Sequence, residues 1–165
     1  MGRVAAVRRV PAGDHGGMET HPIHTAHNRR RHVLLAADLD GSSANAADEA
    51  IDLAAAQEAV LLVLTVVPPD VVPRPLRRGG PSADAERRDR AAHEIVARAA
   101  TRGVTATSVV WYGAPGEAIL EAARTEHADV VVLGSRKRTN LRRLLGSVSS
   151  HVAEEARCPV VIVPA

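Results

Sequence analysis

Five short apolar runs occur along the chain from His32 onward, and each of the first four is followed by a stretch with helical periodicity. The runs are Val33–Ala37, Ala59–Val67, Thr105–Trp111, Asp129–Leu133 and Val160–Val163. Runs of this length and apolar content are typical of strands buried on both faces. Strands that alternate with helices imply right-handed crossovers and parallel pairing. The pattern therefore predicts an α/β fold with an open, mostly parallel five-stranded sheet and helices on both faces.

Composition limits the kind of protein that this chain can be. Its 165 residues suit one domain, and 45% are apolar, with no Phe and a single Trp and Tyr, so Val, Leu, Ile and Ala must build the core. The only cysteine, Cys158, excludes an internal disulfide framework. No run approaches the roughly 20 apolar residues that span a bilayer, and the N-terminal residues lack the apolar region of a secretory signal. We therefore expect a soluble, cytoplasmic protein.

The first 31 residues differ in composition from the rest of the chain. They are rich in Arg, His, Gly and Pro and show no sustained periodicity, so we expect residues 1–31 to be a disordered tail. His21, His24 and His27 recur at every third position, which raises the alternative of a metal site. This spacing fits no common helical ligand pair, and a solvated tail is the favoured interpretation.

Residues 32–165 are expected to form the folded domain, with one long exposed loop. Residues 68–82 hold five of the ten prolines and the Gly79-Gly80 pair, which is typical of a loop. A proline-rich recognition motif is the alternative, but a segment of this composition more often acts as a spacer.

Two of the predicted strands end in residues that can bind a ligand. Asp38 follows the first run, and Gly134 follows the fourth and leads into a basic loop, Arg136 to Arg143. Ser147 is expected to cap the last helix, and a helix N-terminus with nearby cations can bind phosphate. A basic surface loop before an ordinary helix start is the alternative. Ligands of open parallel sheets bind outside the carboxyl ends of the strands, where strand order reverses.

Several other function classes are disfavoured. The chain contains neither a Gly-Lys-Ser/Thr phosphate loop nor a GxSxG nucleophile elbow. A net charge of +2 and the near absence of aromatic side chains for stacking argue against nucleic-acid binding.

Four blocks, in order, resemble the universal stress protein family. They are VLLAADLDGSSANAADEAIDLA from Val33, LTVVPP from Leu64, GAPGEAILEAARTEHADVVVLGSR from Gly113 and GSVSSHVAEEARCPVVIVP from Gly146. The resemblance implies the strand order 3-2-1-4-5 of the adenine nucleotide alpha hydrolase-like fold. It also implies a homodimer formed through the last strand, Val160 to Val163.

The resemblance further implies a site for ATP, with Asp38 helping to hold a phosphate-bound Mg²⁺. Adenine and ribose would lie near Ala37 and Asp38, Val66 would face the adenine, and the later residues would line the phosphates. Val66 is equally expected to be a core residue, and Asp38 a turn or cap residue. The residues implied are Ala37, Asp38, Val66, Gly134, Arg136, Lys137, Arg138, Gly146, Ser147 and Val148.

The phosphate loop departs from the family motif, Gly-x-x-Gly, nine residues, then Gly-Ser/Thr. Lys137 stands at the second glycine, and eight residues separate it from Gly146. Our first hypothesis is a regulatory dimer that binds ATP or a related adenine nucleotide and hydrolyses it slowly or not at all. The alternative is a nucleotide-free dimerisation or adaptor module whose basic loop docks an acidic partner. His151 is expected on the surface of the last helix or against the dimer mate.

Overall fold

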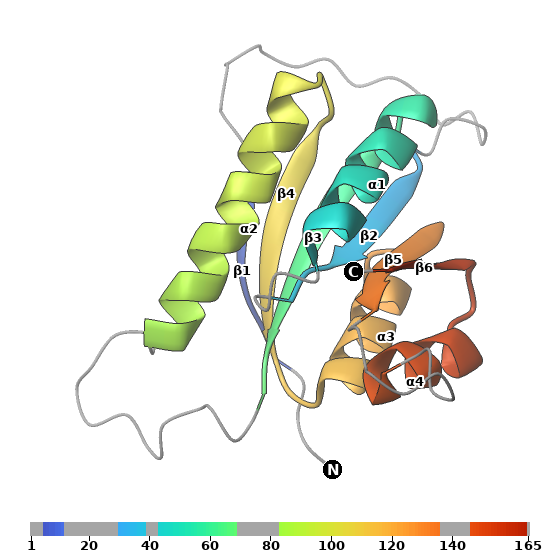
Figure 1. The fold of residues 1–165 in the computed structure, drawn as a ribbon. Helices are drawn as coiled ribbons and strands as arrows, with labels where there is room; N and C mark the ends of the chain where they lie inside the picture. Colours follow the sequence, from blue (N-terminus) through green and yellow to red (C-terminus); the bar gives the residue numbers. More distant parts are fainter. Residues whose placement is uncertain (1–4, 12–29, 39–42, 69–82, 136–145, 165) are drawn as a thin grey trace, which may run out of the picture.

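The computed structural model describes residues 5–11, 30–38, 43–68, 83–135 and 146–164 (Figure 1). Strands and helices alternate from β2 onward, which confirms the predicted α/β class. The strand bounds differ from the predicted runs by only one or two residues. The elements are β1 (Ala5–Pro11), β2 (His32–Ala36), α1 (Ser43–Ala56), β3 (Val60–Val67), α2 (Ala83–Thr101), β4 (Ala106–Tyr112), α3 (Pro115–Thr125), β5 (Val130–Ser135), α4 (Ser147–Glu155) and β6 (Val160–Pro164).

The described strands form one sheet in the order β1-β4-β3-β2-β5-β6. Every pair from β4 to β6 is parallel, so these five strands have the expected 3-2-1-4-5 order. β2 lies between β3 and β5, and the chain runs outward through β3 and β4 on one side and through β5 and β6 on the other. The strand order therefore reverses between β2 and β5, and their carboxyl ends flank the switch point.

Strand β1 is a difference from the sequence prediction. It lies within the segment expected to be disordered, yet it pairs antiparallel with β4, from Ala5 opposite Tyr112 to Pro11 opposite Thr107. The edge of β4 offers a row of backbone N–H and C=O groups, and the backbone of β1 pairs with them. The adjacent arginines Arg8 and Arg9 interrupt the apolar pattern, so no strand signal is visible in the sequence. Residues 1–4 and 12–29, with the histidine series, lie outside the described residues, as does most of the loop over 68–82.

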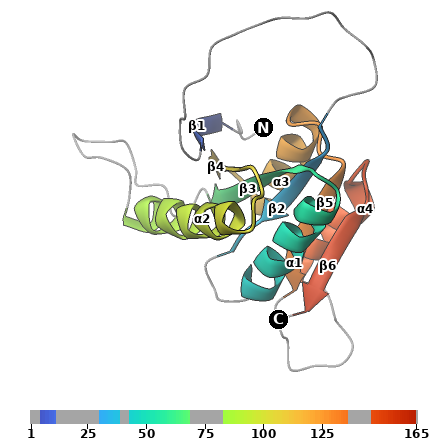
Figure 2. The same ribbon diagram turned by 90° about the horizontal axis from the view of Figure 1, so that it is seen from above.

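The sheet is covered on both faces, as the apolar runs predict (Figure 2). On one face, α1 and α2 pack against alternate strand residues such as Val33, Leu35 and Val63. On the other face, α3 and α4 pack against the residues between them, such as Leu34 and Leu64. Because successive side chains of a strand point to opposite faces, one apolar run supplies both halves of the core. Within the described residues, no helix is both long and apolar enough to cross a membrane.

The start of α4 differs in detail from the prediction. Ser147 was expected to cap the helix, but Gly146 is the N-cap residue and Ser147 is the first helical residue. Within the described part of the chain, no side chain caps this helix through a hydrogen bond. In α3, Pro115 lies in the first turn, where the missing N–H has no helical partner to lose.

Candidate functional site

The first half of the candidate site follows β2. The amide of Ala37 donates to the carbonyl of Leu64 over 2.8 Å, so pairing with β3 extends one residue beyond the strand. Ala37 is half-buried and packs against the core under α1 and α2. The next residue, Asp38, has a side chain that is 37% exposed at the carboxyl edge of the sheet. Its carboxylate is therefore fixed near the switch point while part of it still faces solvent.

Arg88 is a neighbour of Asp38 that sequence reasoning missed. It lies on α2, and its guanidinium Nη1 is 3.9 Å from Oδ1 of Asp38. Only 14% of the Arg88 side chain is exposed, although this part of α2 is rich in charged residues. Arg88 precedes the fully buried Ala92 by four residues, which places it on the stripe that faces the sheet. In the sequence, the signal for this contact was an arginine at a position where the helical periodicity predicts a buried apolar residue.

Val66 lies near the end of β3 and is 8% exposed. It pairs in register with Trp111 of β4 and belongs to the core under α3 and α4. The core interpretation of Val66 is therefore correct. A contact between Val66 and an adenine ring stays a prediction.

The second half of the candidate site follows β5. Strand β5 continues past Leu133, so that Gly134 pairs with Val163 and Ser135 with Pro164. Because Ala36 pairs with Leu133, Gly134 and the residues that follow β2 lie at the same edge of two adjacent strands. Arg136, Lys137 and Arg138 lie outside the described residues, so the middle of the basic loop stays a prediction.

The start of α4 is open. Gly146 has φ −71° and ψ 164°, a backbone conformation that any residue adopts. A Cβ built at Gly146 meets no described atom within 4 Å. Ser147 is exposed, and Val148 is half-buried against the core. Neither backbone conformation nor packing in the described structure thus requires a glycine at this position.

His151 links α4 to the start of α3. Its Nε2 lies 2.9 Å from Oε1 of Glu117, and its ring sits where a Cβ on Gly116 would be, 2.6 Å from Cδ2. The side chain is 41% exposed, in line with the expected surface position, but its contact is with its own chain. Gly116 therefore leaves room for the His151 ring between α3 and α4.

A groove of about 730 Å³ lies away from these residues, between the C-terminal parts of α3 and α4. Leu120, Ala128 and Cys158 line it together with charged residues that include Arg124 and Glu155. Burial, aided by the negative charge of Asp129, raises the pKa of the Cys158 thiol. Among the described residues, none of those implied for the nucleotide site lines this groove.

The chain matches the model of the universal stress protein family over residues 29–164, and it therefore belongs to that family. It is 32% identical over 143 residues to universal stress protein YxiE of Bacillus subtilis, with 79% of this chain and 97% of that protein covered. It is 36% identical over 134 residues to a universal stress protein of Thermus aquaticus, with 79% and 96% covered. A solved structure of a universal stress protein in complex with cAMP is similar, with a TM-score of 0.63, 29% identity, and 81% and 96% of the two chains covered.

Proposed function

We propose that this chain is a regulatory protein that binds ATP or a related adenine nucleotide where β2 and β5 end. Ala37 and Asp38 lie near the adenine and ribose, and Val66 faces the adenine from β3. The phosphates lie along Gly134 and the basic residues Arg136, Lys137 and Arg138. They end at the start of α4, which Gly146, Ser147 and Val148 form.

The uncapped start of α4 is the observation that carries this proposal. A helix N-terminus presents backbone N–H groups without helical partners and the positive end of the helix dipole. In the described structure no side chain caps α4, and the space beyond Gly146 is open. A phosphate placed there accepts hydrogen bonds from the first-turn amides. The glycine then has a role, because it lets the phosphate approach the backbone.

The class of nucleotide is supported by one relative. The structure at 29% identity is described as a complex with cAMP. Cyclic AMP and ATP share the adenosine and phosphate groups that the two halves of the site would bind. We therefore include cAMP with ATP among the ligands to be tested.

Hydrolysis is expected to be slow or absent. The sequence has no Walker-type Gly-Lys-Ser/Thr, and Lys137 is its only lysine. In the described part of the chain, no three His, Cys, Asp or Glu side chains cluster as a metal site. Phosphoryl transfer also needs a group that positions the attacking water at the terminal phosphate, and no such group has been identified among the described residues.

A homodimer formed through β6 is part of the proposal. β6 ends the described sheet, and its apolar residues Val160, Val161, Ile162 and Val163 are only half-buried in the single chain. An edge strand presents unpaired backbone groups that a second copy can satisfy. Sedimentation of the purified protein at twice the mass of the chain is the expected result.

Binding is tested by isothermal titration with ATP, ADP, AMP, cAMP and adenosine. Ser147→Glu is the informative variant, because an anion in the first turn stabilises a helix but repels phosphate. We expect this variant to fold, to bind ATP at least about tenfold more weakly and to bind adenosine unchanged. The matched control is Ala153→Glu, which adds the same charge at an exposed position farther along α4. If no adenine nucleotide binds the wild-type protein, the proposal is wrong.

The nucleotide-free adaptor is the second candidate. It is favoured by Lys137 at the motif's second glycine and by the shorter spacing to Gly146. Under this alternative, wild-type protein binds no nucleotide, and Lys137→Gly creates binding. A wild-type protein that binds and a Lys137→Gly variant that binds no better would exclude it.

A further inference from the structure

The structure places a cation of α2 beside Asp38. Asp38 is the carboxylate to which the family resemblance assigns a phosphate-bound Mg²⁺. Arg88 Nη1 lies 3.9 Å from its Oδ1. Magnesium binds carboxylate oxygens at about 2.1 Å, so an ion on that oxygen would lie within about 6 Å of the guanidinium. A divalent cation and a guanidinium repel each other at this separation, so these residues do not fit a magnesium ion on Asp38.

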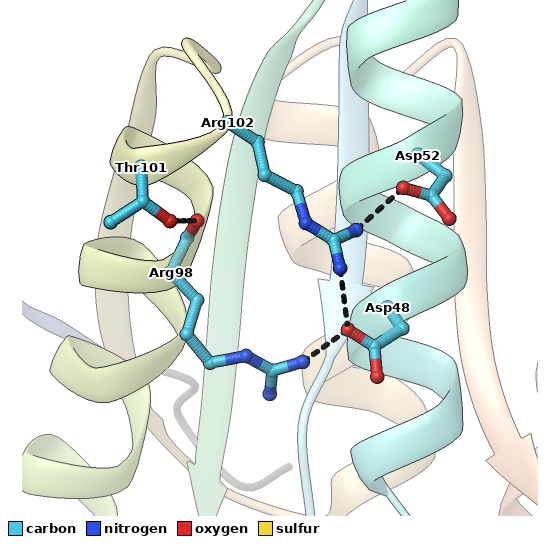
Figure 3. Close-up of polar contacts among 5 residues, drawn as sticks. All are labelled: Asp48, Asp52, Arg98, Thr101 and Arg102. Atoms are coloured by element: carbon cyan, nitrogen blue, oxygen red, sulfur yellow. Dashed lines mark hydrogen bonds and ion pairs between the residues drawn. The ribbon is translucent and has the colours of Figure 1, made fainter.

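The position of Arg88 is imposed by the fold. On α2, Ala92, Ile95, Val96 and Ala99 are buried against the sheet, and Arg88 continues their stripe toward the carboxyl edge. Arg98, near the end of α2, and Arg102, just after it, reach across to α1 (Figure 3). Both bind Asp48, and Arg102 Nη1 also lies 2.6 Å from Oδ1 of Asp52. Packing and these contacts together hold α2 in one orientation beside α1.

Arg88 differs from those two arginines in burial. Arg98 and Arg102 have side chains that are 44% and 45% exposed, whereas that of Arg88 is 14% exposed. Removing a guanidinium from water is costly unless an anion compensates it, and Asp38 supplies a carboxylate within reach. A guanidinium also stays protonated in proteins, so this positive charge is permanent.

We propose that Arg88 takes the place of the divalent cation at Asp38, so that the site binds adenine nucleotides in their metal-free form. This inference rests on the proposed function. Arg88 offsets the negative charge of Asp38, which would otherwise repel the phosphates of an incoming nucleotide. It also excludes Mg²⁺ from the carboxylate. Nucleotides that need no metal to be bound, among them AMP and cyclic AMP, suit such a site as well as ATP does.

The test compares ATP binding in excess Mg²⁺ and in EDTA at equal ionic strength. Four proteins are compared: wild type, Arg88→Gln, Arg88→Lys and the control Arg90→Gln, which removes a charge from an exposed position of the same helix. For wild type and Arg90→Gln we expect the two dissociation constants to agree within about threefold. For Arg88→Gln, Mg²⁺ should strengthen ATP binding by about tenfold or more, because the guanidinium no longer repels an ion at the carboxylate. Arg88→Lys keeps a cation and should behave as wild type.

Each result has one meaning. If wild-type protein binds ATP only with Mg²⁺, the inference is wrong and the proposed function still holds. The same conclusion follows if Mg²⁺ does not change the dissociation constant of Arg88→Gln for ATP. If wild type binds no nucleotide in either buffer, both proposals are wrong. A thermal unfolding curve for each variant verifies that it is folded, and Arg88→Lys tests the inference even if Arg88→Gln does not fold. With cyclic AMP as the probe, Mg²⁺ should have no effect on any of the four proteins.

Discussion

Replacing Gly116 by alanine tests how α3 and α4 are held together. The new Cβ would lie 2.6 Å from Cδ2 of His151, well inside the distance at which carbon atoms attract each other. Because the His151 side chain is 41% exposed, its ring can rotate outward. The variant then loses the 2.9 Å contact between His151 Nε2 and Glu117 Oε1. The clash is thus relieved by one flexible side chain, and the backbones of the two helices need not move apart.

The change in stability follows from two opposing contributions. An exposed pair such as His151 and Glu117 contributes about 0.2–1 kcal/mol. Alanine in place of glycine stabilises a helix by up to about 1 kcal/mol. These nearly cancel, so Gly116→Ala alone should change the free energy of unfolding by less than about 1 kcal/mol. In a His151→Ala background no ring opposes the new Cβ, and the same substitution should stabilise the protein by about 0.5–1 kcal/mol.

Urea unfolding of the wild type, the two single variants and the double variant measures the coupling between the positions. We expect a coupling free energy of about 0.2–1 kcal/mol, which is the contribution of the His151–Glu117 contact, with alanine at position 116 more favourable when His151 is absent. A coupling indistinguishable from zero would refute the reasoning, because it would mean that the ring does not occupy the space beside Gly116.

Three further outcomes are expected. Because burial raises the pKa of the Cys158 thiol, iodoacetamide at about pH 8 should alkylate it several-fold more slowly than it alkylates the urea-unfolded protein, and equal rates would contradict this. Asp48→Asn should cost about 1 kcal/mol or less in urea unfolding, since its contacts with Arg98 and Arg102 are exposed; a loss above about 2 kcal/mol would show that they are stronger than surface pairs. Deleting residues 1–11 uncovers the edge of β4 and should increase self-association in sedimentation velocity, and an unchanged distribution of species would count against a protective role for β1.

Much of the fold could be predicted because its signals are local. The apolar runs gave strand positions to within one or two residues. The order of the strands came from the family resemblance, since the periodicity of a run contains no information about its neighbours in the sheet. β1 could not be predicted, because its segment has no apolar alternation and its pairing needs the edge of β4, which only the folded sheet supplies.

The candidate site was predictable in part. Asp38 and Gly134 do follow adjacent parallel strands, and Gly146 does lie at the start of α4. The sequence analysis assigned the N-cap to Ser147, because a serine before an apolar stripe is a common capping signal. The N-cap is Gly146, one residue earlier, and a sequence pattern does not define a helix end to a single residue. The middle of the basic loop, from Arg136 onward, lies outside the described residues.

The amino-acid sequence by itself determined the class of fold, the covered faces of the sheet and the strand ends at which a ligand can bind, since hydrophobic periodicity and chain order specify these. Only the tertiary structure decided what lies beside Asp38. Arg88 belongs to another helix, far away in the chain, and it reaches the carboxylate because α2 packs across β3 and β4 with its buried stripe toward the sheet. Contacts of this kind depend on how elements pack in three dimensions, which the pattern of a single segment does not contain.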